Sequence, residues 1–225
     1  MATRAEPTQM TLQEATSAKP APQATSKMPS QRTLTIAVIA VAVLALGVWM
    51  VISSARRKEE FGTQALLQAR MIAEQGNLPL AATEFQKVID TYRGSGAAQE
   101  AVIGLNQVRL INGQSDLAAV DLRQFLQSNP DPKYAAPAHG LLGSALENAG
   151  LPGDAAAAFR QASDIAPLGY LKAEYLLNAA RAYLAAGQPA EAEKAYQTIL
   201  DSFPETVSAT EAQVRLSELT AGRQS

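Results

Sequence analysis

The sequence predicts an all-α protein, built as a solenoid of helical hairpins behind a single N-terminal transmembrane helix. The first observation is a set of four glycines spaced 37 residues apart, at Gly76, Gly113, Gly150 and Gly187. A fixed period of this length, repeated four times, indicates stacked supersecondary units. The second is an uncharged apolar run before the repeats. The third is composition: aromatic residues make up only 5%, and the abundant alanine favours helices that pack through small side chains.

The chain begins with a segment, residues 1–32, that is rich in Ala, Thr, Ser, Gln and Pro and has no apolar period. This composition predicts a disordered tail. The tail has four basic and two acidic side chains, so the rest of the chain carries a net charge of −4. An acidic folded part argues against a nucleic acid partner, because phosphate binding needs a basic patch.

Residues 33–55 contain no charged side chain and are bounded by Arg32 and Arg56. A helix of this length reaches roughly 34 Å, enough to cross a bilayer core. Trp49, near one end, suits a membrane interface. The alternative is a signal peptide cleaved after small residues at 53–55. The apolar run is long for a signal peptide, and two arginines would follow the cut, which favours an uncleaved anchor in the lipid bilayer.

A charged juxtamembrane linker is predicted at residues 56–60. Its cluster Arg56-Arg57-Lys58, with Arg70, nearly balances the basic residues before the span, which are Lys19, Lys27 and Arg32. The positive-inside rule therefore does not decide the orientation of the span.

The repeat domain is predicted at residues 61–222, with two helices in each unit joined at its glycine. In the third unit, the first helix is expected from about residue 134 to residue 148, and Asp131-Pro132 suits the cap and first turn at its start. Gly150 ends that helix, because glycine readily adopts a left-handed backbone. A second helix spans about 152–166 and stops at Pro167. The final segment, about 205–220, has no partner repeat and is expected to cap the solenoid.

Two columns of residues keep the 37-residue period and should form the core. Small side chains at helix crossings recur at Ala81, Ala118, Ala155 and Ala192, and large apolar side chains follow one turn later at Phe85, Leu122, Phe159 and Tyr196. A third column comprises Ile72, Arg109, Leu146 and Tyr183. Because Arg109 interrupts it, either Val108 or Leu110 should turn inward in the second unit, or that unit should pack imperfectly at this position.

This pattern resembles the tetratricopeptide repeat. The best matches are residues 141–167 and 178–204, which have a small residue (Gly143 and Ala180), the turn glycine, the alanine, the aromatic residue and the terminal proline. The resemblance implies a tetratricopeptide-type helical-hairpin solenoid, with about four repeats of 37 residues and a C-terminal capping helix.

The layout of tail, single span, charged cluster and repeats resembles the ancillary subunit family of the SecYEG translocon. That resemblance implies an inner-membrane protein with a cytoplasmic N-terminus. It places the repeats outside the cytoplasm, beside the translocon and periplasmic chaperones. The resemblance therefore implies the translocon and the periplasmic chaperones as partners.

Features expected of an enzyme are missing from the sequence. There is no cysteine and no glycine-rich phosphate loop, and the single histidine, His139, falls where a bulky packing residue is expected. We therefore predict no catalytic residues, metal site, cofactor or small-molecule substrate.

The first helices of such repeats line the concave side of the solenoid, and this groove is the predicted protein-binding site. Its positions mix apolar and charged groups, which suits an extended peptide or a partner helix. A lysine–asparagine clamp for a terminal carboxylate is not recognisable, although Arg70 and Arg181 could hold an acidic partner. The predicted groove residues are Leu66, Arg70, Ile103, Gln107, Leu110, Ser144, Glu147, Glu174, Leu177 and Arg181.

The sequence therefore predicts a non-enzymatic, membrane-anchored scaffold, in its most specific form a translocon-associated subunit of the periplasmic chaperone network. The alternatives are a scaffold for envelope assembly or cell division, a cytoplasmic-facing adaptor, and an enzyme subunit that uses groove carboxylates.

Overall fold

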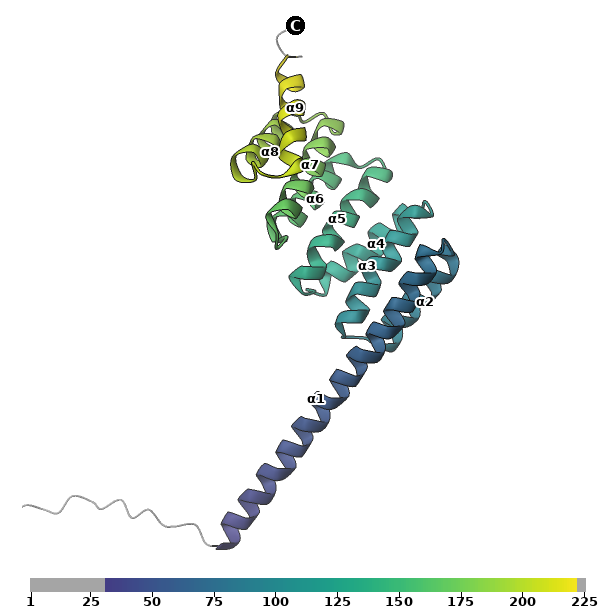
Figure 1. Cartoon of the computed structure of the whole chain (residues 1–225), viewed down its shortest axis with the longest axis vertical. Coiled ribbons are helices and arrows are strands. Elements are labelled where there is room, and N and C mark those ends of the chain that lie inside the picture. The colour runs from purple at the N-terminus through teal and green to yellow at the C-terminus, as the bar shows by residue number, and fades with distance from the viewer. Residues whose placement is uncertain (1–30, 222–225) are drawn as a thin grey trace, which may run out of the picture. The chain divides into compact units, whose positions relative to one another are not determined.

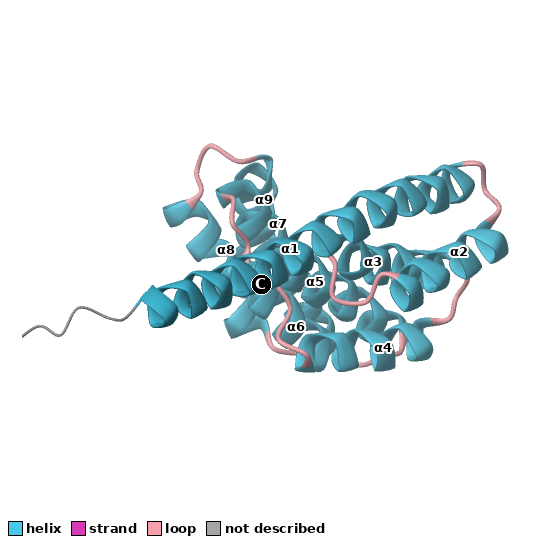
Figure 2. Ribbon diagram, turned by 90° about the horizontal axis from the view of Figure 1, so that it is seen from below, coloured by secondary structure: helices cyan, strands magenta, loops and turns pink. Residues whose placement is uncertain are grey.

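The computed structural model describes residues 31–221, so nearly all of the tail predicted at 1–32 lies outside the described residues. Within the described range the chain is helical, with short loops and no strand (Figure 2). The helices are α1 (Gln31–Glu74), α2 (Leu78–Thr91), α3 (Gly96–Ile111), α4 (Ser115–Gln127), α5 (Pro132–Asn148), α6 (Pro152–Ile165), α7 (Gly169–Ala185), α8 (Pro189–Ser202) and α9 (Val207–Ala221). The chain divides into two compact units, at residues 1–50 and 51–225.

The described part of the first unit is the N-terminal half of α1. The large apolar side chains that the structure describes in this half are exposed, including Leu44 and Trp49. Of the helices described in residues 31–221, only α1 is long and apolar enough to cross a membrane. Residues 56–60, predicted as a linker, lie inside this helix.

The second unit is a stack of helical hairpins, which confirms the predicted fold class. Neighbouring hairpins lie side by side, and helices adjacent in sequence pack together (Figure 1). The final helix, α9, packs against α8 and α7. It buries Ala209 and Ala212 in the same cluster as Tyr196, so the predicted capping role of the last segment is confirmed.

Each repeat turns at its periodic glycine as predicted. Gly76, Gly113, Gly150 and Gly187 have φ values of 80°, 72°, 74° and 69°. These angles lie in the left-handed region, which residues with a Cβ avoid. In the third unit Asp131 caps α5, because its side chain accepts a hydrogen bond from the Lys133 N–H at 3.0 Å.

The periodic alanines and large apolar residues form the core. All four alanines of the column are completely buried, and the large residues of the second column are at most 2% exposed. Close packing explains the glycine at position 143: a Cβ there would lie 2.7 Å from the Phe159 ring. The predicted packing columns are therefore confirmed.

The third column changes chemistry in the second unit. Val108 takes the inward position and is 3% exposed, while Leu110 packs partly buried against the next cluster. The Arg109 guanidinium pairs instead with the Asp121 carboxylate of α4, and it also donates to the Asn106 side chain at 3.3 Å. A polar link between helices thus replaces the apolar contact of the other repeats.

Candidate functional site

A cavity of the second unit lies along the first helices of the repeats, where the concave groove is expected. Its volume is about 720 Å³, and α1, α3 and α5 supply most of its wall, with α2 contributing Leu78 and Phe85. The groove-lining residues are Arg70, Ala73, Glu74, Leu78, Phe85, Glu100, Ile103, Gly104, Gln107, Val108, Ile111, Lys133, Tyr134 and Pro137.

Charged side chains lie at the wall of this groove. The Arg70 guanidinium on α1 pairs with the Glu100 carboxylate on α3, and both side chains are partly exposed. On α5 the Lys133 ammonium lies over the Tyr134 ring, 4.6 Å from its centroid. Because solvent reaches the Arg70–Glu100 pair, the pair costs little to separate, and each partner is available to a ligand.

Pro137 interrupts the regular hydrogen bonding of α5 where this helix lines the groove. Proline has no N–H, so it cannot donate to the carbonyl four residues earlier in α5, which belongs to Lys133. Lys133 and Pro137 both line the cavity. The Lys133 carbonyl therefore lacks the donor that an α-helix usually supplies, in a part of α5 that lines the cavity.

The apolar part of the groove depends on close packing beneath it. Phe85 is 2% exposed and Ile103 is 9% exposed. Gly104 allows this arrangement, because a Cβ at that position would lie 2.6 Å from the Phe85 ring. Apolar and charged surfaces thus alternate in one groove, a combination that suits a protein segment.

Three of the residues predicted for the groove, Arg70, Ile103 and Gln107, line this cavity. Leu110 and Ser144 are half-buried, and the Ser144 hydroxyl donates to the Gly140 carbonyl at 3.4 Å.

The structure places Leu66 and Leu177 elsewhere. Leu66 is 2% exposed, in the cluster with Phe85, and Leu177 is 7% exposed, in the cluster with Tyr196. Their side chains are buried in the packed core and do not line the groove cavity. On a helix with 3.6 residues per turn, a small error in the assigned face moves a residue from groove to core.

The remaining predicted residues lie nearer the C-terminal end of the repeats. Glu147, Glu174 and Arg181 are exposed. Partial burial raises the pKa of the Glu147 carboxyl, and the charge of Arg181 opposes this shift. Arg181 also lines a second cavity, of about 420 Å³, between α7, α8 and α9, together with Leu184, Tyr196, Arg215, Glu218 and Leu219.

Sequence reasoning missed several residues that line these cavities. Glu100, Tyr134 and Pro137 were outside the groove positions assigned by repeat register. Arg215 was missed because it belongs to the capping helix, which has no equivalent position in the repeats. A proline inside a predicted first helix was the available signal for Pro137, since it must leave a carbonyl without a partner.

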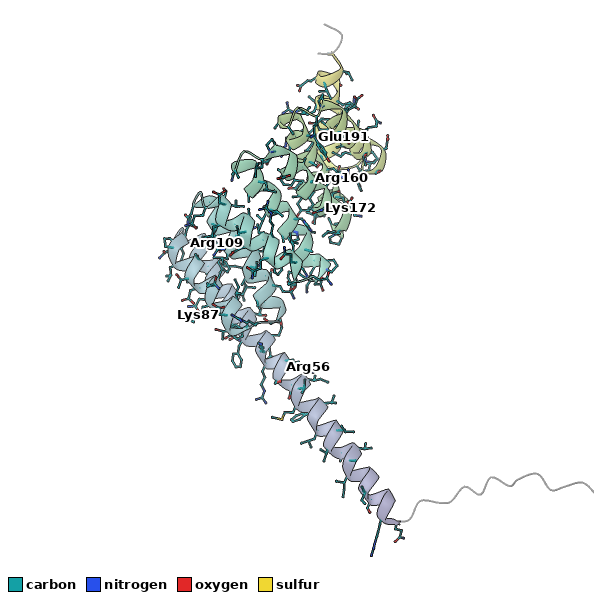
Figure 3. All side chains as sticks on the ribbon, turned by 180° about the vertical axis from the view of Figure 1, so that it is seen from behind. Arg56, Lys87, Arg109, Arg160, Lys172 and Glu191 are labelled. Atoms are coloured by element: carbon teal, nitrogen blue, oxygen red, sulfur yellow. The ribbon has the colours of Figure 1, made fainter. Side chains whose placement is uncertain are left out.

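A further group of charged residues lies on α6, α7 and α8. Arg160, Lys172 and Glu191 line a separate cavity of about 370 Å³ and lie near one another in Figure 3. The Glu191 carboxylate pairs with the Lys194 ammonium at 2.7 Å. This arrangement is an ordinary surface network, so the two cavities above remain the stronger candidates.

Comparison with known proteins agrees with the repeat pattern. The family model described as a tetratricopeptide repeat-like domain matches residues 51–173, more than half of the chain. A second model, described as a tetratricopeptide repeat, matches residues 177–222. No curated protein matches the chain.

Proposed function

Because this chain belongs to the tetratricopeptide repeat-like domain family, we propose that it is a membrane-anchored, non-catalytic scaffold that holds other proteins in the groove of α1, α3 and α5. Proteins of this fold typically act as protein–protein interaction scaffolds. The groove of about 720 Å³ is the observation that carries the proposal for this chain.

The chemistry of the groove supports a polypeptide ligand. Phe85, Ile103 and Tyr134 offer apolar contact, and the exposed Gln107 amide offers a donor and an acceptor for a peptide backbone. The Arg70–Glu100 pair can exchange its partners for charged groups of a ligand. An extended peptide or a helix presents these three kinds of group together.

The apolar half of α1 supports a membrane anchor. A helix of this length with exposed leucine, valine and isoleucine side chains fits the hydrocarbon core of a bilayer. The finer proposal is an inner-membrane subunit with its repeats outside the cytoplasm, where it receives emerging chains from the translocon or recruits a chaperone. The order of tail, span, charged cluster and repeats supports this version.

Site-specific photocrosslinking in intact membranes tests the groove. A photoreactive residue at Gln107, which lines the groove, should form adducts with other proteins. The matched control is Gln124, which is exposed on the second helix α4 of the same repeat. Mass spectrometry of the Gln107 adducts identifies the partners. Equal adducts at both positions would contradict a groove-based scaffold, and adducts without translocon or chaperone subunits would contradict the finer version.

A reporter fused after Ser225 tests the orientation. A periplasm-specific reporter such as alkaline phosphatase should be active, and a cytoplasm-specific one should be inactive. The reverse result would make the protein a cytoplasmic-facing adaptor, with the groove proposal unchanged.

A further inference from the structure

The second cavity is lined by a residue whose buried hydroxyl finds no hydrogen-bond partner among residues 31–221. Tyr196 on α8 is 0% exposed, and its hydroxyl makes no hydrogen bond to any of the described residues. Burial raises the pKa of the Tyr196 phenol, so this group is a neutral O–H donor at neutral pH. A buried hydroxyl without a partner is unfavourable, and such groups need an explanation.

The hydroxyl lies in the electrostatic field of Arg181 and Arg215, from α7 and α9, and of the acidic groups Glu211 and Glu218. Arg181, Arg215 and Glu218 line the cavity with Tyr196. Both arginines are already positioned by neighbours on their own helices. Arg181 donates to the Asn178 side chain, while Arg215 lies 3.2 Å from Glu218 and 3.7 Å from Glu211.

We infer that this cavity is a subsite for a carboxylate carried by an acidic side chain of a bound protein segment. The Tyr196 hydroxyl and the guanidinium groups of Arg181 and Arg215 would donate to the two carboxylate oxygens. A carboxylate accepts up to about four hydrogen bonds, and bonds from guanidinium groups are the stronger ones. This inference rests on the proposed scaffold function and assigns it a ligand chemistry outside the groove of α1, α3 and α5.

The depth at which the Tyr196 hydroxyl lies favours a side-chain carboxylate over a chain terminus. Tyr196 lines the cavity but is fully buried, so a ligand reaches its hydroxyl only if neighbouring side chains move. A carboxylate on a slender methylene stem can enter such a site more readily than an α-carboxylate, which is attached to a branched Cα. Leu184 and Leu219 form the apolar part of the wall. They would contact an apolar residue next to the acidic one.

A peptide selection on the full-length protein in detergent micelles tests the inference. One library consists of random heptapeptides displayed through their C-termini, so that no free α-carboxylate is present, and a second presents free C-termini. The first library should be enriched in Asp or Glu next to Leu, Ile or Met. An enriched peptide is then synthesised with blocked ends, together with its Glu→Gln counterpart, and binding is measured by fluorescence anisotropy.

Tyr196→Phe is the decisive variant, because it removes only the hydroxyl and retains the packed ring. We expect an unchanged or higher melting temperature and peptide affinity reduced by about tenfold. Arg181→Gln should weaken binding similarly. The control Arg123→Gln, an equal charge change at an exposed site on α4, should change affinity less than about twofold, within the usual range for distant surface charges.

Three results would overturn the inference. These results are enriched peptides without acidic residues, equally tight binding to Tyr196→Phe and to the wild type, and binding that requires a free C-terminus. Binding that is insensitive to Tyr196 but is lost in Gln107→Glu would leave the scaffold function in place and remove the carboxylate subsite. Binding that depends on Tyr196 and not on Gln107 would leave the carboxylate subsite in place and would contradict peptide binding in the groove.

Discussion

The Glu59 carboxylate accepts a hydrogen bond from the backbone N–H of Gly96 at 2.9 Å, and another from Ala97 at 3.1 Å. Glu59 therefore caps the start of α3, where the backbone N–H groups have no helical partner and the helix dipole favours negative charge. The first residues after the apolar run are thus attached to the second repeat.

Replacing Glu59 with alanine should lower the free energy of unfolding by about 1 kcal/mol, because two N–H groups at the start of α3 lose their acceptor. Urea unfolding of the full-length protein in detergent, followed by circular dichroism, measures this. Glu60→Ala is the matched control, since Glu60 is exposed on the same turn of α1. Equal effects of both substitutions would show that Glu59 acts only through its general charge.

Gly143→Ala should destabilise the third repeat by about 1–3 kcal/mol, because overpacked cores force neighbouring side chains to move. The new Cβ would lie 2.7 Å from the Phe159 ring. Gly153→Ala in the first turn of α6 is the control, because its Cβ would have no atom within 4 Å. That substitution should be neutral or slightly stabilising, since it reduces the entropy of the unfolded chain. Thermal unfolding of both variants checks the contrast.

The partly buried pair of Arg109 and Asp121 should show strong coupling between α3 and α4. Their side chains are 15% and 32% exposed, so Asp121→Ala leaves Arg109 poorly solvated and should cost about 1–3 kcal/mol. The double variant Arg109→Met, Asp121→Ala should recover part of this loss, because the unpaired charge is gone. A double-mutant cycle measures the coupling. Additive losses would argue against a specific ion pair.

His139 should make stability depend on pH below neutrality. Burial lowers the pKa of its imidazole from the ordinary 6.5, so the unfolded chain takes up a proton at a higher pH than the folded protein. The free energy of unfolding should therefore be insensitive to this group above pH 6.5 and should fall as the pH drops from there towards the folded pKa. His139→Gln should reduce this loss between pH 7 and pH 5.5 in urea titrations. An unchanged slope would assign the pH effect to carboxylates.

The repeat architecture could be predicted because its determinants are local and periodic. Gly150 turns the chain through its own backbone freedom, and Ala155 and Phe159 lie one turn apart on the same face of α6. The same signals recur in every unit, so each repeat supports the reading of the others. No such signal marks which face of a first helix lines the groove. Leu66 and Leu177 were therefore predicted in the groove, although both are buried.

The candidate sites could be predicted only in part, because they combine residues from different repeats. Arg70 was expected in the groove, but its pairing with Glu100 joins residues 30 positions apart on α1 and α3. The Tyr196 hydroxyl, which has no partner among the described residues, is a stronger example of a site feature that sequence does not predict. By sequence Tyr196 is the large apolar residue of its repeat, and its ring does fill that position.

The sequence by itself determined the period, the turns, the packing columns and the presence of one long apolar helix, because these follow from residue size, backbone freedom and hydrophobicity within short segments. Only the tertiary structure decided which polar groups meet. Glu59 reaches the start of α3 and Arg109 reaches Asp121, while the Tyr196 hydroxyl lies in the electrostatic field of Arg181 and Arg215 with no hydrogen-bond partner among the described residues. Polar pairing depends on distances of a few ångströms between helices, which one-dimensional periodicity does not encode.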